Sequence, residues 1–141
     1  MPLCLTAGTA AAVLALNSFT LAWNHSIEKI RWEEDWQIAD ARLHLVEARV
    51  RGAGAGMEAP AGAVLRDGVW HYRPPGAPLA SLRLTHSPYT ADYEICTPEQ
   101  CRQLSTLLPG LEEFAVVEVT SCAGSTLPFK NVGPSSASPG K

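Results

Sequence analysis

Hydrophobic and polar side chains alternate along residues 19–38 with a period of two. The alternation runs to residue 28, breaks, and resumes from residue 30 to residue 38. Because successive side chains of a strand point to opposite faces, the pattern predicts two extended strands that share one buried face.

The break at Glu28-Lys29 suggests how the two strands are joined. A two-residue hairpin loop there places His25 opposite Trp32. Glu-Lys lacks the asparagine, aspartate or glycine that such turns prefer, so a bulge or one long bent strand is the alternative.

Similar patterns predict strands over residues 42–50, 64–66, 69–72, 79–85, 92–96, 101–104 and 114–119. Asp67-Gly68 is the strongest hairpin signal of the chain, and Asp40-Ala41 is a second candidate turn. A helical turn is predicted over residues 103–108. Short, frequent strands with turn signals between them indicate an all-β fold, a small antiparallel β-sandwich or open barrel with at most one short helix.

Residues 3–23 carry no charged side chain. We expect two early strands here, and a membrane helix or a processed leader is the alternative. The first basic residue is Lys29, so a basic n-region is missing and no clear cleavable signal peptide is recognised. The sequence does not decide the compartment, although it favours the cell envelope, either periplasmic or membrane-associated.

Composition limits the domain organisation and the classes of partner. Of the 141 residues, 46% are hydrophobic and 18% are charged, which is enough for one globular core. We expect one β domain over residues 1–122 and a flexible tail over residues 123–141, where Gly, Ser and Pro dominate. The formal net charge is −3 and no basic run occurs, which argues against nucleic-acid binding.

The four cysteines suggest disulfide chemistry. Cys96 and Cys101 flank a four-residue turn and face each other across a predicted hairpin, so a disulfide is expected in an oxidising compartment, with free thiols as the alternative. A second bridge between Cys4 and Cys122 stays open. The cysteine spacing and the scattered histidines do not match zinc motifs, so we expect neither a metal nor a cofactor.

His25 and Glu34 fall on the predicted buried face, where their desolvation is costly unless they are paired. Ser26 points to the opposite face, so a direct Ser–His nucleophile pair is not expected. Three interpretations are open: a buried pair that sets the strand register, a ligand or partner site, or catalysis with His25 as base and a carboxylate as its orienter.

Three glycines occur at alternate positions in the stretch that follows the predicted strand over residues 42–50. Gly52, Gly54 and Gly56 precede Met57, which does not continue into a phosphate-binding helix. A turn or edge bulge is expected, and an anion-binding nest is the alternative. The nearby Arg49 and Arg51 would help to hold a carboxylate, which is consistent with a small organic acid as ligand.

The four tryptophans are expected to fill the core, with an aromatic binding platform as the alternative. In the run Glu33-Glu34-Asp35, the first and third side chains are expected to be solvated.

The chain resembles a family catalogued as domain of unknown function 1850. The family pattern is similar to F-x-L-x-W/Y-x-H-S-V-E-K, followed by an acidic-aromatic strand and G-x-G-A-G-M/L-x-P. Matching positions, over about residues 3–105, include Phe19, Leu21, Trp23, His25, Ser26, Glu28, Lys29, Glu34, Gly54, Ala55, Gly56, Met57 and Pro60.

The resemblance implies a function only indirectly. Genes of the family typically lie beside those of a TRAP-type solute transporter that uses TAXI-type binding proteins, which is an associational argument. We therefore expect a non-enzymatic accessory or ligand-binding module whose partner is a TRAP permease or a TAXI binding protein. A small hydrolase-like enzyme and a structural partner of a permease are the alternatives. The expected ligand or partner surface consists of His25, Ser26, Glu28, Glu34, Arg51, Gly52, Gly54, Gly56 and Met57.

Overall fold

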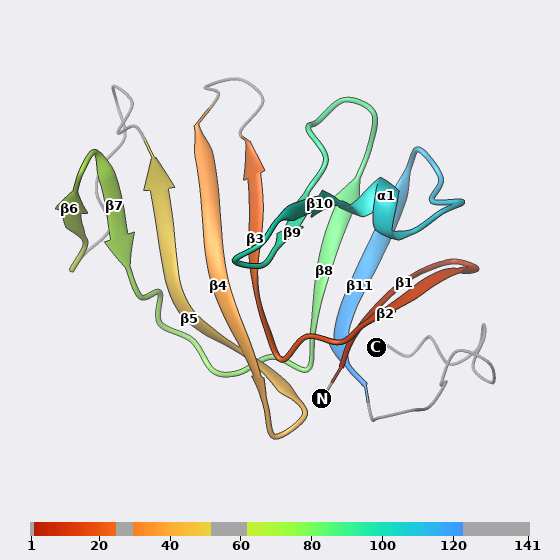
Figure 1. The fold of residues 1–141 in the computed structure, drawn as a ribbon, viewed down its shortest axis with the longest axis horizontal. Coiled ribbons are helices and arrows are strands. Elements are labelled where there is room, and N and C mark those ends of the chain that lie inside the picture. Colours follow the sequence, from red (N-terminus) through yellow and green to blue (C-terminus); the bar gives the residue numbers. More distant parts are fainter. Residues whose placement is uncertain (1, 25–29, 52–61, 123–141) are drawn as a thin grey trace.

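The computed structural model describes residues 2–24, 30–51 and 62–122 as two antiparallel sheets and one short helix (Figure 1). The four-stranded sheet has the order β2 (Ala10–Leu14), β1 (Leu3–Ala7), β11 (Ala115–Ser121) and β8 (Ser81–His86). The seven-stranded sheet has the order β10 (Cys101–Gln103), β9 (Glu94–Cys96), β3 (Ser18–Asn24), β4 (Arg31–Ala39), β5 (Arg42–Arg51), β7 (Val69–Tyr72) and β6 (Val64–Arg66). The helix α1 is Leu104–Leu107. The predicted all-β fold class is confirmed.

The core lies where the two sheets face each other. The four-stranded sheet contributes buried side chains such as Leu5 and Val119, and the seven-stranded sheet contributes Phe19 and Trp36. Leu104 of α1 packs into the same cluster. In Figure 1, β7 and β6 lie at the far side of the larger sheet, away from the four-stranded sheet. The larger sheet therefore extends beyond the four-stranded sheet that packs against it.

Residues 3–23 form three strands, so the expectation of two was wrong. The extra strand arises because the chain turns between β1 and β2 at Gly8, whose φ is +60°. Glycine has no Cβ and adopts this left-handed conformation readily. The Ala-rich stretch is thus folded back on itself as a hairpin. Within the described residues, no helix is long and apolar enough to span a bilayer.

The β3–β4 pairing differs from the predicted register by two residues. Trp23 lies opposite Trp32 and Leu21 opposite Glu34, whereas the two-residue loop would have put His25 opposite Trp32. Residues 25–29, which lie between the described ends of β3 and β4, are outside the described residues, so the predicted Glu-Lys loop stays a prediction. The observed register brings the two indole rings into a stack with centroids 6.2 Å apart.

Both predicted tight turns are present. Asp67 and Gly68 have φ of 50° and 78° between β6 and β7, and Asp40 and Ala41 have φ of 54° and 59° between β4 and β5. Two successive positive φ angles are typical of a type I′ turn, which matches the twist of the flanking strands. Aspartate tolerates this conformation better than alanine does.

Ala41→Gly is therefore expected to stabilise the protein by about 1 kcal/mol, because it removes the steric cost of a left-handed alanine. The measurement is chemical denaturation followed by tryptophan fluorescence. Ala39→Gly is the matched control, since Ala39 lies in β4 and glycine there should destabilise. Equal effects of the two variants would contradict the assignment of strain to Ala41.

Two disulfides join the described cysteines. Cys96–Cys101 closes the β9–β10 hairpin between residues that face each other in register, as predicted. Cys4–Cys122, which the sequence left open, links β1 to the residue that follows β11. The second bridge spans a sequence separation of 118 residues and ties together the two ends of the described domain.

Candidate functional site

Glu34 lies on the inner face of β4, the face that carries Trp36 into the core. The ladder places Leu21 of β3 on one side of Glu34 and Ala48 of β5 on the other. Tyr72 of β7 follows Ala48 in the same row. The next row runs through Trp23, Trp32, Val50 and Trp70. A carboxylate thus lies within an otherwise apolar and aromatic surface, which we call the inner aromatic face.

The Glu34 carboxylate is half-buried and has one hydrogen bond among the described residues, donated by Trp36 Nε1 at 3.1 Å. Burial raises its pKa, and the Trp36 hydrogen bond only partly opposes that shift. Burial and the negative charge of Glu34 also raise the pKa of Tyr72 and of Tyr93. The carboxylate is therefore electrostatically coupled to aromatic rings on both sides of β4.

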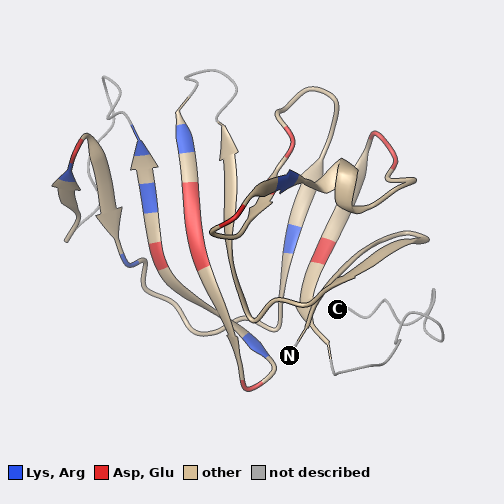
Figure 2. Cartoon of the chain, in the orientation of Figure 1, with Lys and Arg blue, Asp and Glu red and all other residues tan. Residues whose placement is uncertain are grey.

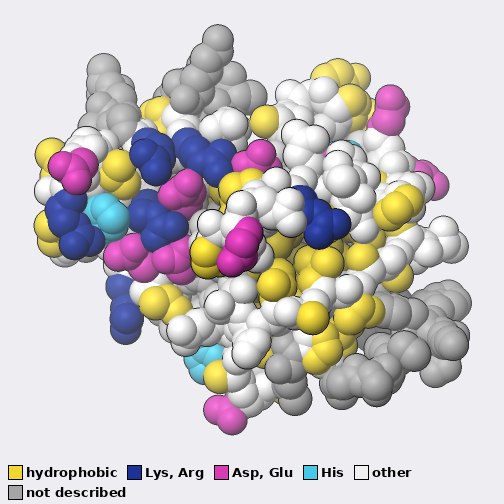
Figure 3. All heavy atoms as spheres, viewed as in Figure 1, with side chains coloured by type: hydrophobic (Ala, Val, Ile, Leu, Met, Phe, Trp, Pro, Cys, Tyr) yellow, Lys and Arg dark blue, Asp and Glu magenta, His cyan; other side chains and the backbone are white. Residues whose placement is uncertain are grey.

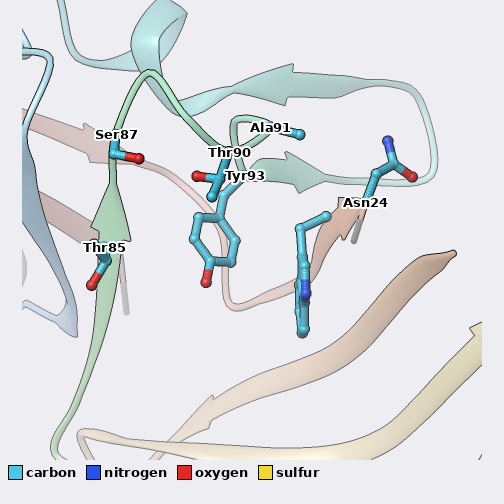
Figure 4. Close-up of a pocket in the computed structure, with 7 residues that line it drawn as sticks. Asn24, Thr85, Ser87, Thr90, Ala91 and Tyr93 are labelled. Carbon is cyan, nitrogen blue, oxygen red and sulfur yellow. The ribbon is translucent and has the colours of Figure 1, made fainter. Parts of the chain in front are cut away.

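A pocket of about 270 Å³ opens beside this face, between the end of β3 and the segment that joins β8 to β9. Its lining consists of Trp23, Asn24, Thr85, Ser87, Thr90, Ala91 and Tyr93. Figure 4 shows the ring of Tyr93 between Thr85 of β8 and the end of β3. The Trp23 and Tyr93 rings are tilted against each other with centroids 5.5 Å apart. Two aromatic rings and several hydroxyl and amide groups therefore line this pocket.

Glu34→Gln is expected to raise the melting temperature at pH 7 by about 2–4 °C. The folded-state pKa of Glu34 lies above its unfolded value, so the ionised group destabilises the folded protein at neutral pH. Glutamine keeps an oxygen for Trp36 Nε1 and carries no charge. The gain should vanish as the pH falls well below about 4, where Glu34 is protonated in both states. Thermal unfolding of Glu113→Gln, at an exposed position, is the control, and an unchanged or lower melting temperature of Glu34→Gln at pH 7 would refute the argument.

The opposite face of the larger sheet carries a dense set of ion pairs, which we call the outer ion network. Arg49 of β5 donates two hydrogen bonds to Asp35 at 2.7 and 2.8 Å, one to Glu33 at 3.0 Å and one to Glu47 at 2.9 Å. Arg31 of β4 forms ion pairs with Glu33, at 2.9 Å, and with Glu94, at 3.1 Å. Figures 2 and 3 show these charges gathered over β4 and β5.

The network shifts the pKa values of its carboxylates. The hydrogen bonds from Arg49 hold the pKa of Asp35 below its usual value. Burial raises the pKa of Glu33, but the hydrogen bonds from Arg31 and Arg49 outweigh it and the net shift is downwards. The expectation that Glu33 and Asp35 are merely solvated was therefore wrong. The suggested role of Arg49 in holding an organic acid also fails, because its guanidinium is already occupied by three carboxylates.

The predicted site residues are only partly described. Glu34 lies on the inner aromatic face, and Arg51 is exposed at the end of β5. The others, His25, Ser26, Glu28, Gly52, Gly54, Gly56 and Met57, lie outside the described residues, as does the predicted tail. The predicted His25–Glu34 pair and the glycine loop therefore stay predictions.

The tryptophans do not all fill the core. Trp36 is buried at 5% exposure, and Trp23 packs against the core from its edge, but Trp32 and Trp70 are only half-buried. The reason is that the larger sheet extends beyond the smaller one at this end. The alternative interpretation, an aromatic binding platform, stays a prediction.

Sequence reasoning missed a cluster near α1. Asp92 Oδ2 accepts hydrogen bonds from the Ser105 amide at 3.2 Å and hydroxyl at 2.7 Å, and Asp92 Oδ1 lies 3.5 Å from His86 Nδ1 in an ion-pair geometry without a well-formed hydrogen bond. The aspartate stands between the serine and the histidine, whereas a nucleophile triad needs the histidine in the middle. We interpret the cluster as an anchor between α1 and the β8–β9 segment. No motif in the sequence marks it.

Glu94, Cys96 and Cys101 also lie close enough together to suggest a metal site, with ligand atoms within 4.8 Å of one another. Both sulfurs are used in the Cys96–Cys101 bond, so neither is a thiolate ligand. Arg31 Nη2 lies 4.0 Å from both sulfurs, which further disfavours a cation there.

The comparison with known families agrees with the motifs. The sequence model described as "Domain of unknown function (DUF1850)" matches residues 19–104, from the second residue of β3 to the first residue of α1. The chain belongs to the DUF1850 family. The match includes Trp23, Glu34 and Tyr93, so the inner aromatic face lies within the DUF1850 region. No curated protein and no solved structure matched the chain.

Proposed function

We propose that this DUF1850 protein is a non-enzymatic, ligand-binding accessory module of a TRAP-type solute transport system with a TAXI-type binding protein. The observation that carries the binding role is the pocket between β3 and β8, with the rings of Trp23 and Tyr93 in its wall. A concave site with aromatic walls and a few polar groups favours binding of a small molecule over a flat protein contact.

The contacts of the described histidines support a binding role over catalysis. His71 and His86 lie beside the carboxylates of Glu47 and Asp92, and His44 contacts a main-chain carbonyl oxygen. In none of these three contacts does the imidazole face a nucleophile that it could deprotonate. The enzyme hypothesis therefore depends on His25, which lies outside the described residues.

The proposed transport association is supported by the gene neighbourhood that the resemblance implies. The two disulfides favour an oxidising compartment such as the cell envelope, where solute-binding proteins work. A TRAP permease or a TAXI binding protein is the partner that we propose.

The binding role is tested by titrating the full chain with panels of organic acids, organic cations and neutral metabolites while the intrinsic tryptophan fluorescence is followed. Saturable quenching that weakens in Trp23→Phe is expected. The partner is tested by co-purifying the tagged chain with a co-expressed TRAP permease and TAXI-type binding protein. If His25→Ala lowers only the melting temperature and leaves this association intact, His25 has an architectural role. Absence of both ligand binding and co-purification would overturn the proposal.

A further inference from the structure

We propose that the pocket between β3 and β8 binds the charged group of a small organic cation, an ammonium or a guanidinium, with Trp23 and Tyr93 as aromatic walls and Glu34 as the counter-charge. The inference rests on the proposed binding function and names the ligand class of the same site.

The walls of the pocket favour a cation. Trp23 stacks on Trp32 with an angle of 8° between their planes and meets Tyr93 at 55°, so two aromatic surfaces at different angles border the pocket. The faces of aromatic rings carry negative electrostatic potential and attract ammonium and guanidinium groups. Hydroxyl and amide oxygens of Asn24 and Thr90 are available at the rim to accept hydrogen bonds from such groups.

Among the described residues, the charge that acts on the wall of the pocket is negative. No lysine or arginine occurs among the described residues that line it. Glu34 follows Trp32 by two positions on the same face of β4, and its charge acts on Tyr93 in the pocket wall. Among the described residues, no basic side chain forms an ion pair with Glu34, in contrast to Glu33 and Asp35 on the other face. In this proposal the Glu34 carboxylate, which does not line the pocket itself, acts on the ligand as the nearby counter-charge.

The size of the pocket limits the ligand. Sites for drug-sized molecules occupy roughly 300–1,000 Å³. A volume of about 270 Å³ lies just below that range, which suits a metabolite of the size of choline or arginine. A second hollow of about 400 Å³ lies on the outer face, where Asp35 and Arg49 in its wall already neutralise each other.

The test compares choline with 3,3-dimethyl-1-butanol, the uncharged carbon analogue of the same shape, by tryptophan quenching and calorimetry on the full chain. Choline is expected to bind about tenfold more tightly than the neutral analogue. Glu34→Gln should remove most of that difference and leave the neutral analogue unaffected. Glu113→Gln, the same change at an exposed position, should bind choline like the wild type. Arginine and tetramethylammonium are further cationic probes.

The outcomes separate this inference from the proposed function. Saturable binding of an acid such as glutarate, weakened by Trp23→Phe, would keep the binding function and overturn the cation assignment. Equal affinities for choline and its neutral analogue, or equal behaviour of Glu34→Gln and Glu113→Gln, would also overturn it. Quenching by phosphatidylcholine vesicles without quenching by free choline would assign the site to a lipid headgroup and reject a small ligand. Absence of binding by every class would reject both proposals.

Discussion

Replacing both Cys4 and Cys122 by alanine is expected to lower the free energy of unfolding by about 5 kcal/mol, the value that the chain-entropy relation gives for a loop of this length. The bond joins residues separated by 118 positions, so its loss releases almost the entire domain in the unfolded ensemble. For a domain of this size the corresponding fall in melting temperature is on the order of 15 °C.

The structural position of the bond supports a large effect. Cys4 lies in β1, which pairs with β11 from Leu3 opposite Ser121 to Thr6 opposite Glu118. Strands from opposite ends of the described domain are thus hydrogen-bonded to each other, and the Cys4–Cys122 disulfide links them covalently. Cys4 is 2% exposed, so alanine introduces no polar group into that buried position.

The double replacement of Cys96 and Cys101 is the internal control. This bond closes a loop with a sequence separation of 5, for which the same relation gives about 2 kcal/mol. Denaturant titrations of the oxidised wild type and both double variants provide the comparison. Equal losses in the two variants would show that loop length does not govern the stabilisation.

The second large effect is expected at Arg49. Arg49→Ala should destabilise the protein by about 2–3 kcal/mol at pH 7, because it leaves three carboxylates on one sheet face without their shared cation. This value is lower than for a fully buried ion pair, since the Arg49, Asp35 and Glu47 side chains keep 19%, 35% and 32% of their exposure and water screens the charges. Arg49→Lys should recover only part of the loss, because lysine cannot form the paired hydrogen bonds to Asp35.

The pH dependence of stability tests the same network. The folded-state pKa values of Asp35 and Glu33 lie below their unfolded values, so the folded protein binds fewer protons at acid pH. Their stabilisation is present above the unfolded values, near pH 4, and is lost as the pH falls through the folded-state values. In Arg49→Ala, the free energy of unfolding should therefore fall less steeply as the pH is lowered.

The matched control is Arg83→Ala, at an exposed position of β8, which should change stability by less than about 0.5 kcal/mol. Urea titrations between pH 2.5 and 7 measure both variants. An acid profile of Arg49→Ala that matches the wild type would contradict the assignment of the low pKa values to Arg49.

Several elements follow from short stretches of sequence. The alternation of side chains predicted β4 and β5, Asp67-Gly68 predicted the β6–β7 hairpin, and the spacing of Cys96 and Cys101 predicted a disulfide across a turn. Each of these features depends on residues fewer than about ten positions apart. Their geometry follows from backbone preferences and the two-residue period of a strand.

The candidate site was only partly predictable. Glu34 was recognised because it interrupts a hydrophobic face, and that residue does lie on the inner aromatic face. The predicted β3–β4 register was shifted by two, because the alternation of side chains fixes which face a residue lies on but not which residue of the neighbouring strand lies opposite it. The pocket itself needed Tyr93 and Thr85 beside β3, and no local pattern relates these residues.

Local patterning was thus sufficient for the strand content, the tight turns and the presence of an unusual carboxylate. Packing decided which strands became neighbours, such as β1 beside β11, and which tryptophans stayed at the rim of the core. It also decided that Arg49 is paired with three carboxylates, whereas Glu34, on the opposite face of β4, has no basic partner among the described residues. The physical reason is that strand pairing and ion pairing between distant segments depend on the free energy of the whole fold, which no short window of sequence contains.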